Sequence, residues 1–242
     1  MEASKIVIAV MPAYNAAKTI KKTYKDIPSG TVDKVIVVDD GSADETIKVA
    51  KSLGLQVFSH PQNRGYGANQ KTCYTLALSE GADVVVMIHP DYQYDSTLTG
   101  ELIRPIVQGR FDVMLGSRIR TREEVLRGGM PLYKYIFNRL LTTIENIVLG
   151  QNLSEYHTGF RAFNKQILIK LPFHKYSDDF VFDQQILFGA IARGAKIGEI
   201  PVPVRYSKEA SSINFQRSLV YGLSILKDLV RLKLLGKRIF AQ

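Results

Sequence analysis

The sequence predicts an α/β fold, with a mostly parallel sheet flanked by helices and amphipathic helices toward the C-terminus. In the first half, short β-branched runs alternate with amphipathic helical patterns. The runs KVIVVDD and DVVVMIHPD are apolar until they end in acidic or polar residues. Strands that are buried on both faces have this form where their carboxyl ends open into a site.

Strands and helices are predicted to alternate through the first half of the chain. The strands cover Lys5–Met11, Lys34–Asp39, Gln56–Ser59, Val84–His89 and Val113–Leu115. The helices between them cover Ala16–Asp26, Asp44–Leu53, Ala68–Ser79 and Leu98–Gln108. This order is typical of a parallel sheet that is covered by helices.

The second half of the chain is predicted to be mainly helical. Apolar residues at helical spacing indicate helices over Gly128–Leu149 and around Phe182–Ala192. Two short strands, split by Pro201 and Pro203, lead to a basic amphipathic helix over Ser218–Phe240. We expect one domain over residues 1–215. The closing helix, residues 216–242, is expected to pack on that domain, on a partner subunit or on a membrane surface.

Composition limits the classes of protein to which the chain can belong. The single cysteine, Cys73, excludes an internal disulfide framework and a zinc site built from several thiolates, and it favours a reducing compartment. No export signal is visible, and no apolar run approaches the roughly 20 residues that span a bilayer. We therefore expect a cytoplasmic protein. The net charge of +9 favours anionic partners. Basic blocks, zinc-finger spacings and RNA-recognition signatures are missing, so no nucleic-acid partner is expected.

Polar residues at the ends of two predicted strands are expected to form a binding site. Asp39 and Asp40 end one strand, and His89 and Asp91 end another. In open α/β sheets, ligands bind at the carboxyl ends of the strands, so these side chains should converge there. The alternative is that each acidic pair only begins a turn, because aspartate and glycine are common turn residues.

A series of motifs extends over nearly the whole chain. In order they are VMPAYNAAKTI, VVDDGSADET, HPQNRGYGANQ, VVVMIHPDYQYD, LGSR, SEYHTGFRAF and DDFVFDQQI. Together they resemble the family 2 glycosyltransferases, especially the branch with dolichol-phosphate mannose synthase and the bacterial polyprenyl-phosphate glycosyltransferases. The resemblance implies a GT-A (Rossmann-like) fold. It also implies inverting transfer of a hexose from a UDP- or GDP-linked donor to a polyprenyl or dolichyl phosphate, in cell-envelope glycan synthesis or protein glycosylation.

The nucleotide part of the donor has candidate residues on the first two strands. In the family, the element at Pro12 and Tyr14 contacts the nucleoside, and Asn15 completes it here. Asp39 and Asp40 match a pair that accepts hydrogen bonds from the base or the ribose, and Arg64 would bring a cation to the same pocket. The alternative for Tyr14 is an ordinary half-buried core tyrosine.

The motif His89-Pro90-Asp91-Tyr92-Gln93 stands where the family usually has Asp-x-Asp-x-Gln. Mg²⁺ and Mn²⁺ prefer carboxylate and phosphate oxygens, so Asp91, Gln93 and a donor diphosphate make a sufficient ligand set. His89 departs from the family pattern. An imidazole ligand would shift the preference toward Mn²⁺ or transition metals. The alternative for His89 is a hydrogen-bonded residue at the strand end without metal contact.

Several cations and one acid are candidates for the chemical step. The resemblance assigns Arg118 to the donor phosphates or the acceptor, and Arg205 and Lys208 to a loop that closes over the diphosphate. An alcohol acceptor needs a base, for which Asp179 is the nominee. A polyprenyl phosphate is already anionic and needs none. The alternative for Asp179 is helix capping.

The expected acceptor is a lipid phosphate at the inner face of a membrane. A basic amphipathic helix can lie in an anionic bilayer interface, which would make the protein a peripheral membrane protein. The same helix can instead dock on its own domain or in a homo-oligomer. Two rival functions remain open: transfer to a hydroxyl of a growing glycan, and binding of sugar nucleotides without turnover. The second is motivated by His89.

Overall fold

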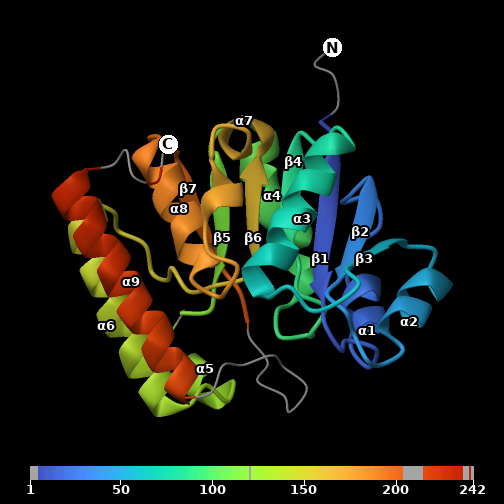
Figure 1. Ribbon diagram of the computed structural model, residues 1–242, viewed down its shortest axis with the longest axis horizontal. Coiled ribbons are helices and arrows are strands. Elements are labelled where there is room, and N and C mark those ends of the chain that lie inside the picture. The colour runs from blue at the N-terminus through green and yellow to red at the C-terminus, as the bar shows by residue number, and fades with distance from the viewer. Residues whose placement is uncertain (1–4, 120, 204–214, 237–239, 241–242) are drawn as a thin grey trace.

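A seven-stranded sheet forms the centre of the protein in the computed structural model (Figure 1). The structure describes residues 5–119, 121–203, 215–236 and 240. The strands are β1 (Val7–Ala13), β2 (Lys34–Asp39), β3 (Gln56–Ser59), β4 (Val84–Met87), β5 (Val113–Ser117), β6 (Arg161–Asn164) and β7 (Ile197–Pro201). Their order across the sheet is β3-β2-β1-β4-β6-β5-β7. The predicted α/β fold with a mostly parallel sheet is confirmed.

One strand runs against the others. β6 lies antiparallel between β4 and β5, whereas the remaining neighbours are parallel. Its first residue, Arg161, pairs with Met87 near the carboxyl end of β4 and with Leu115 of β5. The reversal brings the segment before β6 to the sheet edge at which the parallel strands end. β6 was not among the predicted strands.

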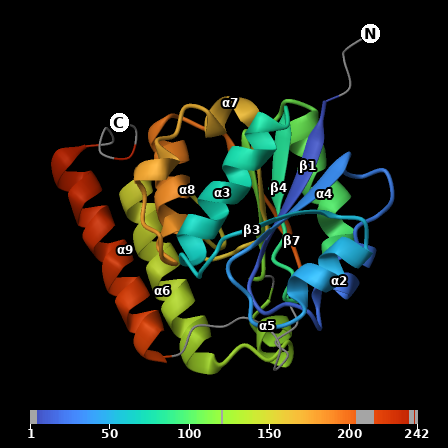
Figure 2. The same ribbon diagram turned by 45° about the vertical axis from the view of Figure 1, so that its right-hand side comes forward.

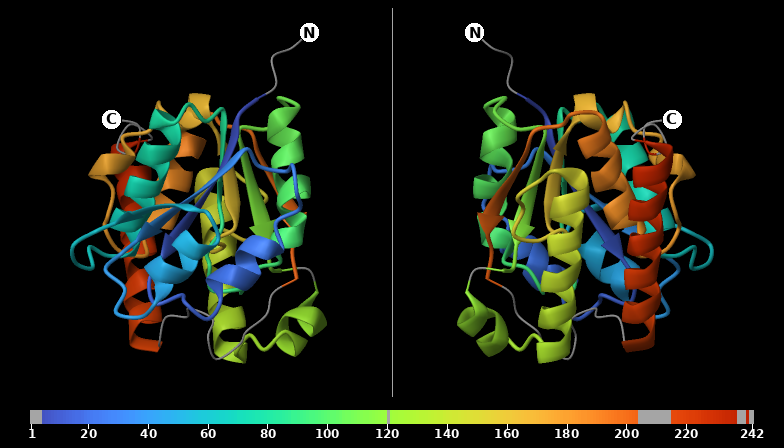
Figure 3. Two further views of the ribbon diagram at one scale, coloured as in Figure 1. Left: turned by 90° about the vertical axis from the view of Figure 1, so that its right-hand side faces the viewer. Right: turned by 90° about the vertical axis from the view of Figure 1, so that its left-hand side faces the viewer.

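Helices cover both faces of the sheet. They are α1 (Ile20–Lys25), α2 (Thr46–Ser52), α3 (Tyr66–Ser79), α4 (Thr99–Val107), α5 (Arg122–Arg127), α6 (Leu132–Leu149), α7 (Lys165–Leu168), α8 (Phe182–Ala192) and α9 (Phe215–Leu235), with short 3₁₀ turns η1 (Ser96–Leu98) and η2 (Phe173–Lys175). One apolar core contains Tyr74 of α3 and Phe188 of α8, and the other contains Ile20 of α1 and Leu102 of α4. Figure 3 shows α3 and α8 on one face of the sheet and α4 on the other.

The helices α6 and α9 lie side by side at one end of the molecule (Figures 1 and 2). Ile225, Leu229 and Leu232 of α9 are buried and join the core that contains α3 and α8. The opposite sides of both helices carry exposed apolar side chains. In the described ranges, no helix has the length and apolarity needed to cross a bilayer.

Most predicted helices are present with shifted ends. α1 begins at Ile20 instead of Ala16, since residues 14–19 form turns that connect the ends of β1 and β2. α9 starts at Phe215 and ends at Leu235, whereas Ser218–Phe240 was predicted. α5 was not predicted as a separate helix. The second of the two strands that Pro201 and Pro203 were predicted to split would follow Pro203 and lies outside the described residues.

Candidate active site

A cavity of about 320 Å³ opens at the carboxyl edge of the sheet. Polar side chains from the strand ends, from α3 and from α8 line one part: Tyr66, His89, Asp91, Gln93, Arg118 and Asp183. Apolar side chains of α6 and α9 line the other part: Phe137, Leu140, Leu141, Ile144, Leu219, Leu223 and Leu226. The cavity thus has a charged end at the sheet and an apolar slot between α6 and α9.

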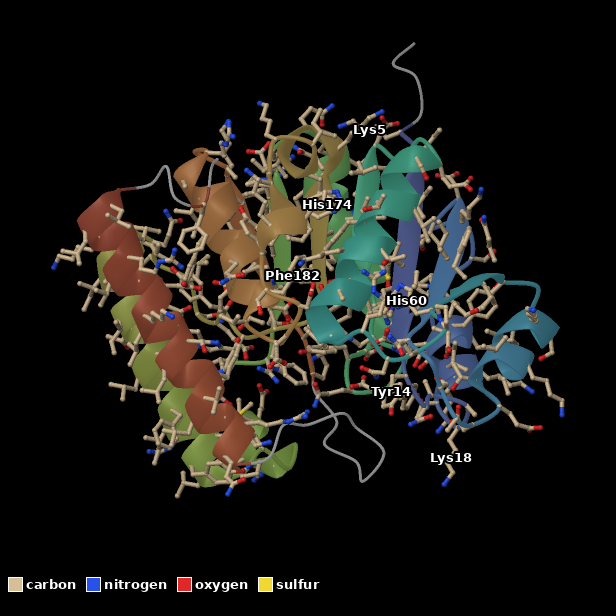
Figure 4. All side chains as sticks on the ribbon, viewed as in Figure 1. Lys5, Tyr14, Lys18, His60, His174 and Phe182 are labelled. Atoms are coloured by element: carbon tan, nitrogen blue, oxygen red, sulfur yellow. The ribbon has the colours of Figure 1, made fainter. Side chains whose placement is uncertain are left out.

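The loop after β1 is tied to the loop after β2. Pro12 is buried within β1, where it pairs with Val38. Asn15 adopts a positive φ of 51°, which asparagine tolerates better than most residues. Its side-chain oxygen accepts from the amide of Ala43, and its own amide donates to Ser42 Oγ. Tyr14 is left 55% exposed at this edge of the sheet (Figure 4). Its ring is therefore accessible to a ligand, and it is not a core residue.

Asp39 and Asp40 are buried and hydrogen-bonded within the protein. Asp39 accepts from the backbone amide and the hydroxyl of Ser42. Asp40 accepts from the amides of Arg64 and Gly65 and lies 2.7 Å from His60 Nδ1. The two carboxylates therefore shape the loops after β2 and β3. Their predicted contact with a nucleoside stays a prediction, as does that of Arg64, whose side chain projects from an exposed position.

Two glycines bring the start of α3 against the segment before α8. Gly65 has a φ of 103°, and the amide of Gly67 donates to the carbonyl of Asp178 over 2.7 Å. A side chain at Gly67 would overlap the carbonyl oxygen of Ser177 and approach Phe182 Cβ to 2.8 Å. Glycine is thus required for this close approach. The contact places Tyr66, which stands between the glycines, beside His89 and Asp183.

His89, Tyr66 and Asp183 form a hydrogen-bonded group at the charged end of the cavity. Tyr66 Oη lies 3.2 Å from His89 Nε2 and donates to Asp183 Oδ2 over 2.8 Å. The rings of Tyr66 and His89 are parallel, with centroids 5.4 Å apart, and Phe180 stacks on Tyr66 at 4.6 Å. Burial lowers the pKa of His89, although the charges of Asp91 and Asp183 oppose the shift.

A buried arginine supports the same group. Arg161 is fully buried, and its guanidinium donates to the carbonyls of Thr158 and Asp183. One of its nitrogens also lies 3.8 Å from Asp183 Oδ2. Burial alone would lower the pKa of Arg161, but the charge of Asp183 and the nearby tyrosine hydroxyls together outweigh it, and the pKa is raised. Arg161 thus stays cationic and anchors α8 to the first residue of β6.

A tight turn after β4 presents Asp91 to the cavity. Asp91 Oδ1 accepts from the amide of Gln93 over 3.0 Å, and Tyr92 between them has a φ of 60°. The ammonium of Lys22 lies 4.8 Å above the Tyr92 ring, which steadies this unusual conformation. Asp91 and Gln93 offer the oxygen atoms that Mg²⁺ and Mn²⁺ prefer. Two protein ligands alone are too few for such an ion, so phosphate oxygens of a bound ligand would supply further ligands. Within the described ranges, no three His, Cys, Asp or Glu residues cluster as a metal site.

Arg118 lines the cavity beside a buried acid that the sequence did not indicate. Its backbone amide and its Nε both donate to Glu155, over 2.7 and 2.8 Å, and Asn138 of α6 donates to the same carboxylate. Burial alone would raise the pKa of Glu155, but the charge and hydrogen bonds of Arg118 outweigh it, and the pKa is lowered. The pair fixes the guanidinium at the edge of β5.

The structure separates the nominated base from the cavity. Asp179 is exposed, accepts from the amide of Phe180 and is not among the cavity-lining residues. Asp183, one helical turn later, lines the cavity instead. Lys134 of α6 also lines it and was missed, because a lysine in an amphipathic helix looks like an ordinary surface residue. Arg205 and Lys208 lie outside the described residues.

The chain belongs to glycosyl transferase family 2, whose model matches residues 8–171. It is therefore a glycosyltransferase, an enzyme, and its sheet and helices have the GT-A type of fold. It is 28% identical to the UDP-N-acetylglucosamine–dolichyl-phosphate N-acetylglucosaminyltransferase of Methanococcus voltae, over 96% of this chain and 98% of that protein. It is 24% identical to glycosyltransferase AglJ of Haloferax volcanii, over 86% of this chain and 66% of that protein.

Solved structures share the fold. The crystal structure of glucosyl-3-phosphoglycerate synthase from Mycobacterium tuberculosis with Mg²⁺ and uridine diphosphate superposes with a TM-score of 0.73. The match covers 96% of this chain and 80% of that chain at 20% identity. The neighbour therefore supports the architecture at the level of the whole chain.

Proposed function

We propose that this enzyme transfers a hexose, with inversion, from a UDP- or GDP-linked donor to a polyprenyl or dolichyl phosphate. The observation that supports the proposal most directly is the lining of the cavity. Cationic side chains line its end at the sheet edge, and apolar side chains of α6 and α9 line the rest. An amphiphile with an anionic head and a hydrocarbon tail matches both parts. The dolichyl phosphate in the name of the M. voltae relative supports the same acceptor class.

The charged end of the cavity favours a phosphate. Arg118 and Lys134 both line it. Burial, and then the charge of Arg118, lower the pKa of Lys134, because two cations at close quarters disfavour each other. An anionic head group between them would relieve that repulsion and accept charge-assisted hydrogen bonds.

The acids near the cavity argue against a hydroxyl acceptor. An alcohol becomes a good nucleophile only when a base removes its proton. Asp183 already accepts from Gln70 at Oδ1 and from Tyr66 at Oδ2, and Asp179 is exposed outside the cavity lining. A phosphate oxygen needs no such base. Transfer to a glycan hydroxyl therefore remains the second candidate.

The donor diphosphate is assigned to the turn after β4. Asp91 and Gln93 would hold Mg²⁺ or Mn²⁺ together with phosphate oxygens of the donor. Such an ion, when bound, offsets the negative charge that grows on the leaving nucleotide. On the donor's nucleoside side we assign Pro12, Tyr14 and Asn15, with Asp39 and Asp40 forming the floor.

The outer faces of α6 and α9 suit an anionic membrane surface. Leu132, Ile136 and Ile147 of α6, and Val220, Val230 and Leu234 of α9, are all more than half exposed and do not line the cavity. The exposed charges on the described part of α9 are the cations Arg217, Lys227, Arg231 and Lys233, whereas Asp228 is buried. A second copy would bring like charges together. We therefore propose peripheral binding to the cytoplasmic face of a membrane, where the slot would meet the lipid.

A transfer assay with two acceptors tests the proposal. UDP-glucose, UDP-N-acetylglucosamine and GDP-mannose are each incubated with polyprenyl phosphate in anionic vesicles or with a free glycan, in the presence of Mn²⁺. We expect transfer to the lipid phosphate, and we expect Asp179→Asn to retain activity within about twofold, since the accepting oxygen carries no proton to remove. Transfer to the glycan alone, with loss of turnover in Asp179→Asn, would establish the hydroxyl alternative instead.

A further inference from the structure

We propose that Tyr66 and Asp183 are positioning residues that hold His89 in its Nε2–H tautomer, so that Nδ1 is free to bind the divalent ion at Asp91. The inference rests on the proposed metal-dependent donor site. It gives a role to the residue at which this chain departs from the family's Asp-x-Asp-x-Gln pattern. It also gives a role to Asp183, which the transfer itself does not use.

The directions of the hydrogen bonds among Asp183, Tyr66 and His89 follow from which of these groups carry a proton to donate. Asp183 receives the amide of Gln70 at Oδ1 and faces the Arg161 cation at 3.8 Å, so its carboxylate acts as an acceptor. Tyr66 has one hydroxyl proton, which it donates to Asp183 Oδ2 over 2.8 Å. The remaining contact of Tyr66 Oη, at 3.2 Å, is therefore one in which it accepts from His89 Nε2–H.

A neutral imidazole that carries its proton on Nε2 has its lone pair on Nδ1. Packing holds the ring in this orientation. Tyr66 stacks on His89 with an interplanar angle of 2°. A side chain at Gly159 would approach His89 Cδ2 to 2.7 Å and Nε2 to 2.8 Å, so the Gly159 backbone lies close against the Nε2 edge. A half-turn of the ring would put Cε1 in the place of Nε2 and would break the contact with Tyr66.

Histidines that bind metals usually donate their second nitrogen to a carboxylate or carbonyl, which fixes the tautomer and raises the basicity of the ligand. Here the phenol of Tyr66 stands between the imidazole and the carboxylate of Asp183. With Nδ1 as a ligand beside the oxygens of Asp91 and Gln93, the site has a mixed nitrogen and oxygen set. Such a set favours Mn²⁺ over Mg²⁺ more than an all-oxygen set does.

The test compares Tyr66→Phe with Tyr74→Phe on the same helix. Tyr74 is buried outside the cavity lining, and its hydroxyl makes no hydrogen bond among the described residues. Both variants lose the same atom. Mn²⁺ binding to the full chain is followed by electron paramagnetic resonance in the presence of UDP or GDP. We expect Tyr66→Phe to bind Mn²⁺ about 10- to 100-fold more weakly, as is typical when an outer partner of a ligand is removed, and Tyr74→Phe to bind like the wild type.

Nitrogen-15 NMR of the histidine rings gives a second measurement that does not depend on turnover. We expect a protonated Nε2 and an unprotonated Nδ1 for His89 in the metal-free wild type, and a mixture of tautomers in Tyr66→Phe. Unchanged Mn²⁺ affinity in Tyr66→Phe, or a proton on Nδ1 in the wild type, would overturn the inference. If the proposed donor site were wrong, the wild type itself would bind neither UDP nor GDP. If only the positioning role were wrong, the wild type would bind nucleotide, and Tyr66→Phe would bind both nucleotide and Mn²⁺ normally.

Discussion

Replacing Asp91 by asparagine is expected to lower kcat about 100- to 1000-fold, in the range of losses seen when one group that stabilises transition-state charge is removed. Asparagine keeps the size of the side chain and can still accept from the amide of Gln93, so the turn should persist. It lacks the negative charge that holds a divalent ion against a diphosphate. Steady-state transfer assays at saturating Mn²⁺ measure the effect.

Asp95→Asn is the matched control. Asp95 lies four residues after Asp91, and its side chain caps η1 by accepting from the amide of Thr97. Asparagine caps as well as aspartate does, so we expect activity within about twofold of the wild type. Equal activities of Asp91→Asn and Asp95→Asn would show that the charge of Asp91 is not needed for the chemical step.

Replacing Arg118 by glutamine is expected to lower the free energy of unfolding by about 3–5 kcal/mol, because Glu155 would be left as an unpaired buried charge. Glu155 is fully buried and receives the Arg118 side chain and backbone amide together. Urea denaturation measures the change. The double variant Arg118→Gln/Glu155→Gln should recover part of the loss, since no buried carboxylate remains.

An exposed ion pair provides the control for Arg118. Arg127 and Glu123 of α5 form a pair in which the side chains are 79% and 69% exposed. Arg127→Gln should change stability by less than about 1 kcal/mol, as is usual for surface pairs. Equal effects at Arg118 and Arg127 would show that the Arg118–Glu155 pair does not stabilise the fold.

The pH dependence of the Arg118 effect has a defined sign. The pKa of Glu155 is lower in the folded protein than its ordinary value. Its contribution to stability is therefore complete above that ordinary value and is lost as the pH falls through the lowered pKa of the folded state. The difference between wild type and Arg118→Gln should shrink over that acidic range.

The fold was largely predictable because its central strands β1, β2 and β4 are buried on both faces. The run KVIVVDD has only apolar residues between its first lysine and its closing aspartates, so the limits of the strand are visible in the sequence. β6 is different. Its four residues, RAFN, begin with an arginine that is buried and held by backbone carbonyls. Since a lone arginine usually indicates a surface position, local pattern alone does not reveal the strand.

The site residues that lie shortly after the ends of strands could be predicted from the sequence. Asp91, Gln93 and Arg118 stand directly after β4 and β5, and the structure brings all of them to one cavity. Tyr66 and Asp183 reach the cavity from α3 and α8, and Glu155 on the loop after α6 is buried against Arg118. Only tertiary packing brings these elements together. The motif RGYG held the one available signal for Tyr66, because paired glycines indicate a close backbone approach.

The central claim is that the carboxyl edge of the sheet binds the diphosphate of a sugar nucleotide through Asp91 and a divalent ion. Calorimetric titration of the wild type with UDP-glucose, UDP-N-acetylglucosamine and GDP-mannose, each with and without Mn²⁺, tests it most directly. The claim predicts binding of at least one donor that strengthens with Mn²⁺ and loses this dependence in Asp91→Asn. Absence of affinity for every donor in the presence of Mn²⁺, or Mn²⁺-dependent binding that is unchanged in Asp91→Asn, would contradict it.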